Sequence, residues 1–379
     1  MVAENYDVIV VGVGSMGSAT CYQLAKRGAR VLGLDQYPVP HSYGAHHGLA
    51  RMIRMAYFEH PNYVPLLRRS YELWDELEHE SNAHILYRTG ALYIGNPGST
   101  LISGAVRSAE EHALAYEILD VEEMGRRYPQ IHMRPDQKAF FEQPAGFLIP
   151  ELAVSSFVEA ARRQGASINT GQEVCRWRAD AKGVTVETSQ NRYQAGQVVF
   201  TGGAWSGKIV RGLGVELNVT LQQQGWFEPK TPEAFQLGKL PAWYIETSGG
   251  HGYYGFPLLP DQSGMKVALH APGRSTDIDT ADRTPDPTIS NEMRDYLREN
   301  LPDAAGTMLD SSVCLYTNSP DSHFIVDRHP EFEKVLVACG FSGHGFKFCP
   351  VIGEALADLA LHGKSQLPIE FLRLSRFDS

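Results

Sequence analysis

Cys314 carries the side chain of this sequence whose reactivity is most distinctive. It lies in the segment Ser-Ser-Val-Cys-Leu-Tyr-Thr, residues 311–317, and is one of 5 cysteines in a chain of 379 residues. The cysteines show no paired spacing, so they do not form a disulfide framework, and unpaired thiols are typical of a reducing cytoplasm. Taken alone, such a thiol is most simply a small buried hydrophobic side chain.

A second group of reactive side chains is basic and lies in residues 44–54. It contains His46, His47, Arg51 and Arg54, which indicates an anion site. The two arginines would share a face if this segment were helical. Adjacent histidines point in different directions, and no His, Cys and carboxylate set here has zinc spacing, so we predict no metal. The simpler alternative is a solvent-exposed basic patch.

Residues 264–270 alternate in the manner of a β-strand. Lys266, Ala268 and His270 fall on one face, and apolar side chains fall on the other. The predicted partner strand, residues 253–257, places Tyr254 nearby across a loop of residues 258–263. The face with Lys266 is therefore either a solvated outer face or the wall of a site.

A glycine-rich loop near the C-terminus, residues 340–347, carries His344 and Lys347. It follows a predicted buried strand, residues 335–339, and precedes a predicted helix, residues 350–361, in which Pro350 suits the first turn. Such a loop could hold a ligand carbonyl or carboxylate at the helix N-terminus. The alternative is a flexible connection.

The N-terminal segment has the pattern of a dinucleotide site. A β-branched strand, residues 7–11, runs into Gly12-Val13-Gly14-Ser15-Met16-Gly17, a helix that ends near residue 28, and a second strand that ends in Asp35. Gly12 suits a tight turn, Gly14 lets a pyrophosphate approach the backbone, and Gly17 lets helix and strand pack closely. Asp35 can accept ribose hydroxyls. The alternative is a glycine-rich turn without a ligand.

This motif does not by itself distinguish FAD from NAD. The unit lies at the start of the chain, and a later strand, residues 197–200, ends in Gly202-Gly203, where the backbone could pass close to a cofactor. Both features favour FAD, although Gly202-Gly203 also suits an ordinary strand-to-helix turn.

Composition sets the broad class of protein. The chain is long enough for two domains and is 43% hydrophobic and 21% charged, as expected of a globular protein. A formal net charge of -10 argues against a nucleic-acid or anionic-membrane partner. The apolar run near the N-terminus is too short for a signal peptide, and no segment reaches the ~18 apolar residues of a membrane span.

The order of expected elements predicts two domains of α/β and α+β class. Strands such as residues 91–94 and 243–246 indicate a mostly antiparallel sheet, and helices are expected over residues 63–78, 151–164 and 290–299. We predict a discontinuous Rossmann-type FAD-binding domain (residues 1–85, 146–220 and 314–379) and a substrate domain (residues 86–145 and 221–313).

Taken together, these motifs resemble the monomeric sarcosine oxidase and N-methyltryptophan oxidase family of flavoprotein amine oxidases, which has a D-amino-acid-oxidase-like fold. The resemblance covers nearly the whole chain and is most specific at Gly343-His344-Gly345-Phe346-Lys347 together with Cys314. It implies that FAD is bound covalently, through a thioether between Cys314 and the flavin C8α methyl group. The other cofactor contacts that it implies are Gly12, Gly14, Ser15, Met16, Gly17, Asp35, Val174, Gly202, Gly343, Gly345 and Lys347.

The resemblance also implies roles for the reactive side chains. Arg54 and Lys347 would bind the substrate carboxylate. Lys266 would assist the reaction with O2, since a fixed cation stabilises superoxide. The remaining implied contacts are His47 and Arg51 against the isoalloxazine, and Tyr244, Tyr254 and His270 around the substrate.

Two departures from the family pattern bear on the substrate. Leu49-Ala50 stands where the family usually has Asp-Thr, and Trp243-Tyr244 stands where the sarcosine enzymes have smaller or thioether residues. Either change could reshape the pocket. We therefore expect a larger N-methyl amino acid rather than sarcosine.

The sequence thus predicts a monomeric, cytoplasmic FAD-dependent oxidase of N-methyl amino acids. The amine would be oxidised to an imine, O2 reduced to H2O2, and the imine hydrolysed to the demethylated amino acid and formaldehyde. The nearest alternative is an oxidase of a cyclic or glycated amino acid, such as pipecolate or a fructosyl amino acid. Two further classes of protein fit the nucleotide motif, an NAD-dependent dehydrogenase with a non-covalent cofactor and a flavin-containing subunit without turnover.

Overall fold

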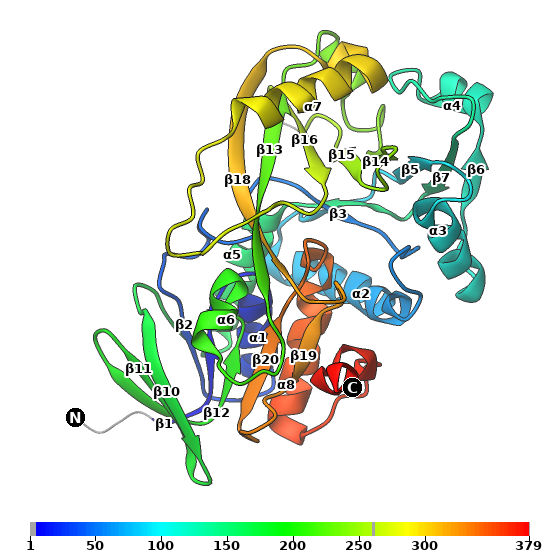
Figure 1. The fold of residues 1–379 in the computed structure, drawn as a ribbon. Helices are drawn as coiled ribbons and strands as arrows, with labels where there is room; N and C mark the ends of the chain where they lie inside the picture. The colour runs from blue at the N-terminus through cyan, green and yellow to red at the C-terminus, as the bar shows by residue number, and fades with distance from the viewer. Residues whose placement is uncertain (1–4, 260–261, 379) are drawn as a thin grey trace.

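Two large β-sheets organise the chain in the computed structural model, which describes residues 5–259 and 262–378. A mostly parallel first sheet lies in the lower half of Figure 1, and a mostly antiparallel second sheet lies in the upper half. Residues 260–261, in the loop predicted between strands near residues 257 and 264, lie outside the described residues.

The first sheet is built around β1 (Asn5–Val11), a β-branched strand buried on both faces. β1 pairs in parallel with β2 (Val31–Leu34) on one side and with β12 (Arg192–Phe200) on the other. Two further strands pair in parallel at the edges, β9 (Ser167–Asn169) with β2 and β20 (Val335–Cys339) with β12. The antiparallel additions are β10 (Val174–Asp180), β11 (Gly183–Thr188) and β19 (Ile325–Arg328).

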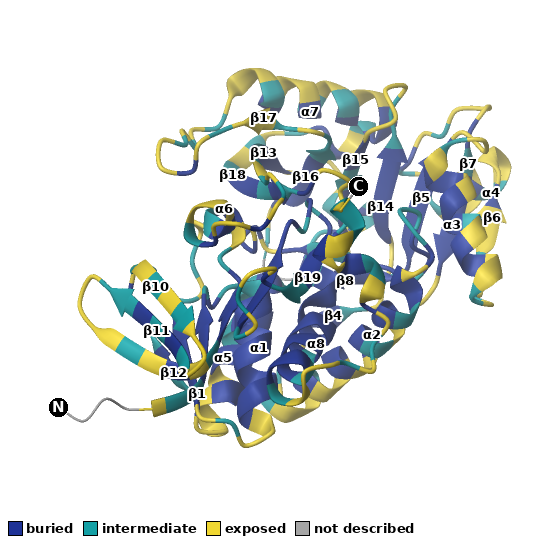
Figure 2. Cartoon of the chain, turned by 60° about the horizontal axis from the view of Figure 1, so that its bottom comes forward, coloured by how far each residue is buried: buried dark blue, intermediate teal, exposed yellow. Residues whose placement is uncertain are grey.

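Helices cover one face of this sheet, where they share an apolar core with Val8, Val10 and Leu336. They are α1 (Ser15–Lys26), α2 (Tyr63–Ser81), α5 (Pro150–Arg163) and α8 (Cys349–His362), close to the predicted ranges. Ile9, Val11 and Phe200 belong to a separate core on the opposite face. Figure 2 shows the buried inner faces of these elements, while the β10–β11 hairpin extends toward solvent.

The second sheet carries one apolar and one partly polar face. Trp243, Val267 and Met265 pack on one face against Met293 of α7 (Pro287–Asn300), on the side away from the first sheet (Figure 1). The strand order is β17 (Arg274–Ser275), β13 (Asn218–Phe227), β16 (Met265–His270), β15 (Gly252–Gly255), β14 (Ala242–Glu246), β5 (Ala91–Gly95), β7 (Lys138–Glu142) and β6 (Glu117–Leu119), and β18 (Met308–Asn318) also pairs with β13. β18 crosses the domain boundary predicted between residues 313 and 314.

Two local features differ from the expectations. Helices α3 (Thr100–Glu111) and α4 (Val121–Arg127) form in a segment for which only strands are expected, because Ser99 and Asp120 cap them by accepting backbone N–H groups. Short helices η1 (Gly203–Trp205), α6 (Ser206–Ile209) and η4 (Phe346–Phe348) order the glycine-rich loops.

A small third sheet overturns the helical alternative for the arginine segment. It contains β3 (Arg51–Ile53), β8 (Gly146–Leu148) and β4 (Leu86–Tyr87). β3 is extended and pairs with β8, so Arg51 and Arg54 do not share a helical face.

Candidate active site

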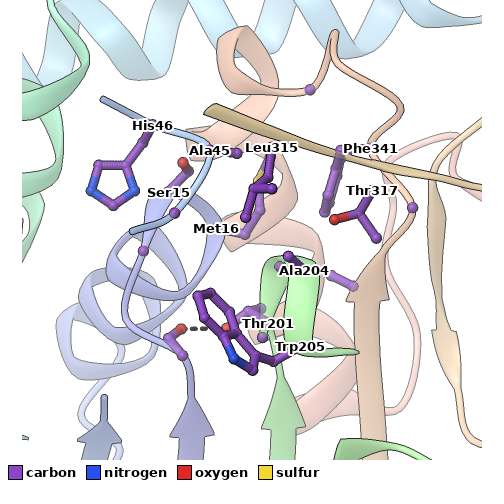
Figure 3. A pocket seen from close by; sticks show the side chains of 18 of the residues that line it. Ser15, Met16, Ala45, His46, Thr201, Ala204, Trp205, Leu315, Thr317 and Phe341 are labelled. Carbon is purple, nitrogen blue, oxygen red and sulfur yellow. Dashed lines mark hydrogen bonds between the residues drawn. The ribbon is translucent and has the colours of Figure 1, made fainter. Parts of the chain in front are cut away.

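One continuous cavity joins most of the residues that the sequence singled out. Its volume is about 1370 Å³, more than the ~300–1,000 Å³ typical of a small-ligand site. Figure 3 shows part of it, where Ser15 and Met16 at the start of α1 lie near His46, Thr201 and Trp205. The residues that the sequence predicted for the site and that line this cavity are Gly12, Gly14, Ser15, Met16, Asp35, Arg51, Arg54, Val174, Gly202, Tyr244, Tyr254, His270, Cys314, Gly343, Gly345 and Lys347.

The nucleotide end has the geometry that the glycine motif requires. Gly12 has φ +90°, and a Cβ atom there would lie 2.6 Å from the Thr201 carbonyl oxygen. A Cβ atom on Gly17 would lie 1.8 Å from the Gly12 carbonyl oxygen, so only glycine lets the helix start this close to the turn. No side chain caps the N-terminus of α1 at Gly14, which leaves its N–H groups available to a phosphate.

Asp35 closes this end of the cavity. Its Oδ2 accepts a hydrogen bond from Val13 N at 2.7 Å, and its Oδ1 accepts one from Tyr37 N at 2.9 Å. Each carboxylate oxygen has a second lone pair, so Asp35 can still accept hydroxyl groups from a ribose. Burial raises the pKa of Asp35 from its usual value, and the hydrogen bonds from Tyr37 and Val13 oppose that rise.

Cys314 lies in β18, on the face of the second sheet that lines the cavity. It is 5% exposed and reduced, and it stands directly opposite Gln222 of β13. Tyr316, two residues further along the same face, also lines the cavity. A thiol in this position can reach a ligand that extends from the nucleotide end.

Arg54 is a buried cation at the far end of the cavity. Its Nη2 donates to both carboxylate oxygens of Glu59, at 2.6 and 2.7 Å, and its guanidinium stacks on the rings of Tyr57 and Phe58 at 4.1 and 4.2 Å. Burial would raise the pKa of Glu59, but Arg54 and then His344 lower it to about 2. The pair therefore stays ionised, and the solvated-patch alternative is wrong for Arg54.

Lys347 is the second buried cation of this region. Its Nζ donates to the His344 carbonyl oxygen at 2.7 Å and lies 3.5 Å from the Tyr57 hydroxyl. Burial lowers the pKa of Lys347 to about 7, Arg54 adds to the decrease, and Glu59 opposes it. A bound anion would therefore restore the charge of Lys347.

An aromatic wall on the second sheet faces these cations. Tyr93, Tyr244 and Tyr254 stand side by side on the neighbouring strands β5, β14 and β15, so their side chains point to the same face. The His270 Nδ1 lies 3.1 Å from the Tyr316 hydroxyl, and burial lowers the pKa of His270 to about 4. Burial also raises the pKa of Tyr254 to about 12, so the wall is uncharged at neutral pH.

The two departures from the family pattern do not both reach the pocket. Trp243 is fully buried in the core against α7, because adjacent residues of a strand point to opposite faces, and only Tyr244 lines the cavity. Leu49 is 38% exposed, and Ala50 is buried outside the cavity lining. The expectation that Trp243 shapes the pocket is therefore wrong.

Lys266 and His47 lie behind the cavity wall rather than on it. The Lys266 Nζ donates to the carbonyl oxygens of Gly48 and Ala50, at 2.7 and 2.9 Å, and the side chain is 3% exposed. The solvated-face alternative for this strand is therefore wrong. The His47 Nε2 is buried without a hydrogen-bond partner among the described residues, and burial lowers the pKa of His47 to about 4.

Arg51 is tied to the backbone around it. Its guanidinium donates to the carbonyl oxygens of Ala50, Ala45 and His47 at 2.5–2.8 Å, and it lines the cavity. It thus places a positive charge beside the cavity without forming an ion pair with any described carboxylate.

Sequence reasoning missed several residues of this site, among them Tyr93, Tyr316 and Glu59. Tyr316 could have been found, because it shares a strand face with Cys314 two residues away. Glu59 had no such signal, because the segment between it and Arg54 is irregular and no periodicity predicts their contact.

Comparison with known proteins agrees with this geometry. Residues 7–359 match the model of the FAD dependent oxidoreductase family. The chain belongs to the FAD-dependent oxidoreductase family. It is 42% identical to a monomeric sarcosine oxidase of Streptomyces avermitilis, over 97% of this chain and 96% of the relative. It is 36% identical to an N-methyl-L-tryptophan oxidase of Salmonella dublin, over 98% of this chain and 99% of the relative.

A solved structure shows the same fold. NikD, described as an unusual amino acid oxidase essential for nikkomycin biosynthesis, matches with a TM-score of 0.87 and 25% identity, over 98% of this chain and 97% of that one. These likenesses confirm the predicted resemblance, the two-domain fold class and a FAD-dependent oxidoreductase. Within residues 5–259 and 262–378 there is no helix suited to crossing a membrane and no cluster of side chains that could hold a metal ion.

The cavity fits FAD on its own evidence. The uncapped start of α1 and the ribose acceptor Asp35 lie at one end, Cys314 and Arg51 line the wall, and the His47 Nε2, which has no partner among the described residues, is buried behind that wall. When bound, FAD supplies the two-electron redox chemistry that no side chain of this cavity can supply.

Proposed function

We propose that this FAD-dependent oxidoreductase oxidises an N-methyl amino acid with O2 as the electron acceptor. The observation that carries the proposal is the pair of buried cations, Arg54 and Lys347, facing an uncharged aromatic wall at the end of the cofactor cavity. Two cations suit a carboxylate, and an uncharged wall suits the less polar rest of an amino acid. The named relatives, which include a sarcosine oxidase and an N-methyltryptophan oxidase, support this substrate class.

Substrate binding changes the partners of both cations. A substrate carboxylate would compete with Glu59 for the Arg54 guanidinium, since Glu59 takes both hydrogen bonds of Nη2. It would also be the anion that keeps Lys347 protonated. The carboxylate thus fixes the amine at the end of the cavity next to His270 and Tyr244.

The side chains beside the reacting amine do not include a strong base. His270 has a pKa of about 4, the pKa of Tyr254 is about 12, and Glu59 is held ionised by Arg54. This supports a substrate that binds as the free amine, for which FAD would supply the electron acceptor. His270 and Tyr316 would orient the amine by hydrogen bonding.

We propose that Cys314 carries the flavin covalently. The thiol lies on the cavity wall, between the nucleotide end and the two cations, where an isoalloxazine ring is expected. Arg51 would lie against the same ring, where its positive charge favours the reduced form of a flavin, and His47 would lie behind the cavity wall.

We propose that Lys266 serves the reaction with O2. It is a buried cation on the strand that also carries His270, and it lies behind the turn at Gly48 that borders Arg51. A fixed positive charge there lowers the cost of placing the first electron on O2.

We further expect a monomer that acts in the cytoplasm. The support is indirect: the described cysteines are unpaired, and four of them, Cys21, Cys314, Cys339 and Cys349, are buried. The residue boundaries of the FAD-binding and substrate domains stay a prediction, and limited proteolysis would test them.

The product balance tests the proposed function. Each N-methyl amino acid should consume one O2 and one water and release one H2O2, one formaldehyde and the demethylated amino acid. We would measure all three products with sarcosine, N-methyl-L-phenylalanine, N-methyl-L-tryptophan and pipecolate. Turnover of pipecolate alone would favour the cyclic-amine alternative, and absence of peroxide with every N-methyl compound would contradict the proposal.

A further inference from the structure

Two oppositely charged side chains form hydrogen bonds with the backbone of the turn at residues 48–50, one from each side. Glu151 Oε1 accepts hydrogen bonds from the backbone N–H groups of Gly48 at 2.6 Å and Leu49 at 3.2 Å. On the other side of the turn, Lys266 Nζ donates to the carbonyl oxygens of Gly48 at 2.7 Å and Ala50 at 2.9 Å. Glu151 comes from α5, which packs against the first sheet, and Lys266 comes from β16 of the second sheet.

The conformation of the turn explains why it needs this support. Gly48 has φ +105° and Leu49 has φ +68°, so two successive residues lie in the left-handed region, which is unfavourable for leucine. A Cβ atom on Gly48 would lie 2.3 Å from the Gln224 amide nitrogen, so the turn is also tightly packed. The anchor of the Lys266 ammonium is therefore a strained segment that Glu151 holds in place.

The charges around Lys266 give Glu151 a second effect. Burial lowers the pKa of Lys266 well below its usual value, and Arg51 on β3 adds to the decrease. Cys314 on β18 and Glu151 on α5 oppose it, and His47 is the other titratable neighbour. A thioether at Cys314 would carry no charge, which leaves Glu151 as the carboxylate that favours the ammonium. Its Oε2 is buried without a partner among the described residues.

We propose that Glu151 is the positioning residue of Lys266: it fixes the turn on which the ammonium is anchored and supplies the negative charge that keeps the ammonium protonated. This inference rests on the proposed role of Lys266 in the reaction with O2. It gives Glu151 an effect on the oxidative half-reaction, although Glu151 lines no part of the cavity.

Glu151→Gln separates the charge from the hydrogen bonds, because the glutamine oxygen can still accept from Gly48 and Leu49. Glu78→Gln is the matched control, since Glu78 Oε1 likewise accepts from two successive N–H groups, those of Ile85 and Leu86, far from Lys266. We expect Glu151→Gln to slow reoxidation of the reduced enzyme by O2 by about tenfold at pH 9 and less at pH 6, since losing a nearby charge favours the neutral amine. Anaerobic reduction by substrate should stay within about twofold of wild type, as in Glu78→Gln.

A stability measurement on the holoenzyme tests the same coupling without turnover. The native pKa of Lys266 lies below the unfolded value of ~10.4. At pH values between these two pKa values the native state binds fewer protons than the unfolded state, so the free energy of unfolding rises with pH in that range. Removing Glu151 lowers the native pKa further. The Tm of Glu151→Gln should therefore lie furthest below wild type at the acidic end of the range, and the gap should close as the pH rises through the native pKa of Lys266. The gap should not change with pH for Glu151→Gln in a Lys266→Met background.

Equal loss in both half-reactions, a reoxidation profile like that of wild type, or a Tm gap that ignores pH would each overturn the inference. A wild-type enzyme that O2 does not reoxidise would instead overturn the proposed function. The Tm series would then still decide whether Glu151 and Lys266 are coupled.

Discussion

Replacing Lys347 by methionine removes a buried charge from the proposed carboxylate site while keeping most of the side-chain length. Lys347 and Arg54 are the cations that face the end of the cavity, so the variant keeps one of two charge-assisted partners. Losing one such hydrogen bond costs about 1.5–3 kcal/mol, or about 10- to 100-fold in the Kd of a carboxylate ligand. The methyl ester of the same ligand should lose little, because it lacks the anion.

The pH dependence makes this prediction sharper. The pKa of Lys347 in the free enzyme is about 7, because burial disfavours the ammonium. A carboxylate binds the protonated form, so the wild-type Kd should be flat below pH 7 and rise up to tenfold per pH unit above it. The Lys347→Met enzyme should show no such rise, and Lys347→Arg, which stays charged, should bind without it.

Equilibrium titration of the visible flavin spectrum with a carboxylate inhibitor, from pH 6 to 9, would measure these values. Lys239→Met, at an exposed position far from the cavity lining, is the control for removal of a lysine charge. If Lys347→Met binds the inhibitor as tightly as wild type, or keeps the same rise with pH, Lys347 does not contact the carboxylate.

Three further predictions concern the flavin, oxygen and the substrate side chain. After acid precipitation the wild-type flavin should stay with the polypeptide, whereas Cys314→Ala should release it; flavin free in the wild-type supernatant would exclude the thioether. Lys266→Met should slow reoxidation by O2 by orders of magnitude in stopped-flow experiments and leave anaerobic reduction nearly unchanged, and a loss confined to reduction would make Lys266 a substrate residue. The wild-type specificity constant should be higher for N-methyl-L-tryptophan than for sarcosine. Tyr244→Ala should reduce the ratio of these two specificity constants by about 2- to 10-fold, since an aromatic contact contributes about 0.5–1.5 kcal/mol. A wild-type preference for sarcosine would contradict this role of Tyr244.

Local patterns in the sequence predicted the parts of the site that depend on neighbouring residues. The turn from Gly12 to Gly17 and the acceptor Asp35 belong to a contiguous strand, turn, helix and strand, so the spacing of these residues predicts their geometry. Alternation in β16 likewise placed Lys266 and His270 on one face, although the sequence alone did not show that this face is buried.

Contacts between distant segments could not be predicted in this way. Glu151 meets the turn at Gly48 from more than 100 residues away, and Lys266 meets it from more than 200, so no window of sequence contains the arrangement. The spacing of Arg51 and Arg54 would place them on one face of a helix, but pairing with β8 makes the segment extended. Tertiary pairing overrode the local preference there, as it did for Trp243, whose direction depends on which face of β14 packs against α7.

Anaerobic mixing with an N-methyl amino acid tests directly whether the bound flavin oxidises this class of substrate. We expect N-methyl-L-phenylalanine to bleach the visible flavin absorbance in the absence of oxygen, and readmitted O2 to restore it with one H2O2 released per flavin. A flavin that stays oxidised with every N-methyl amino acid tested, or that O2 does not restore, would contradict the account.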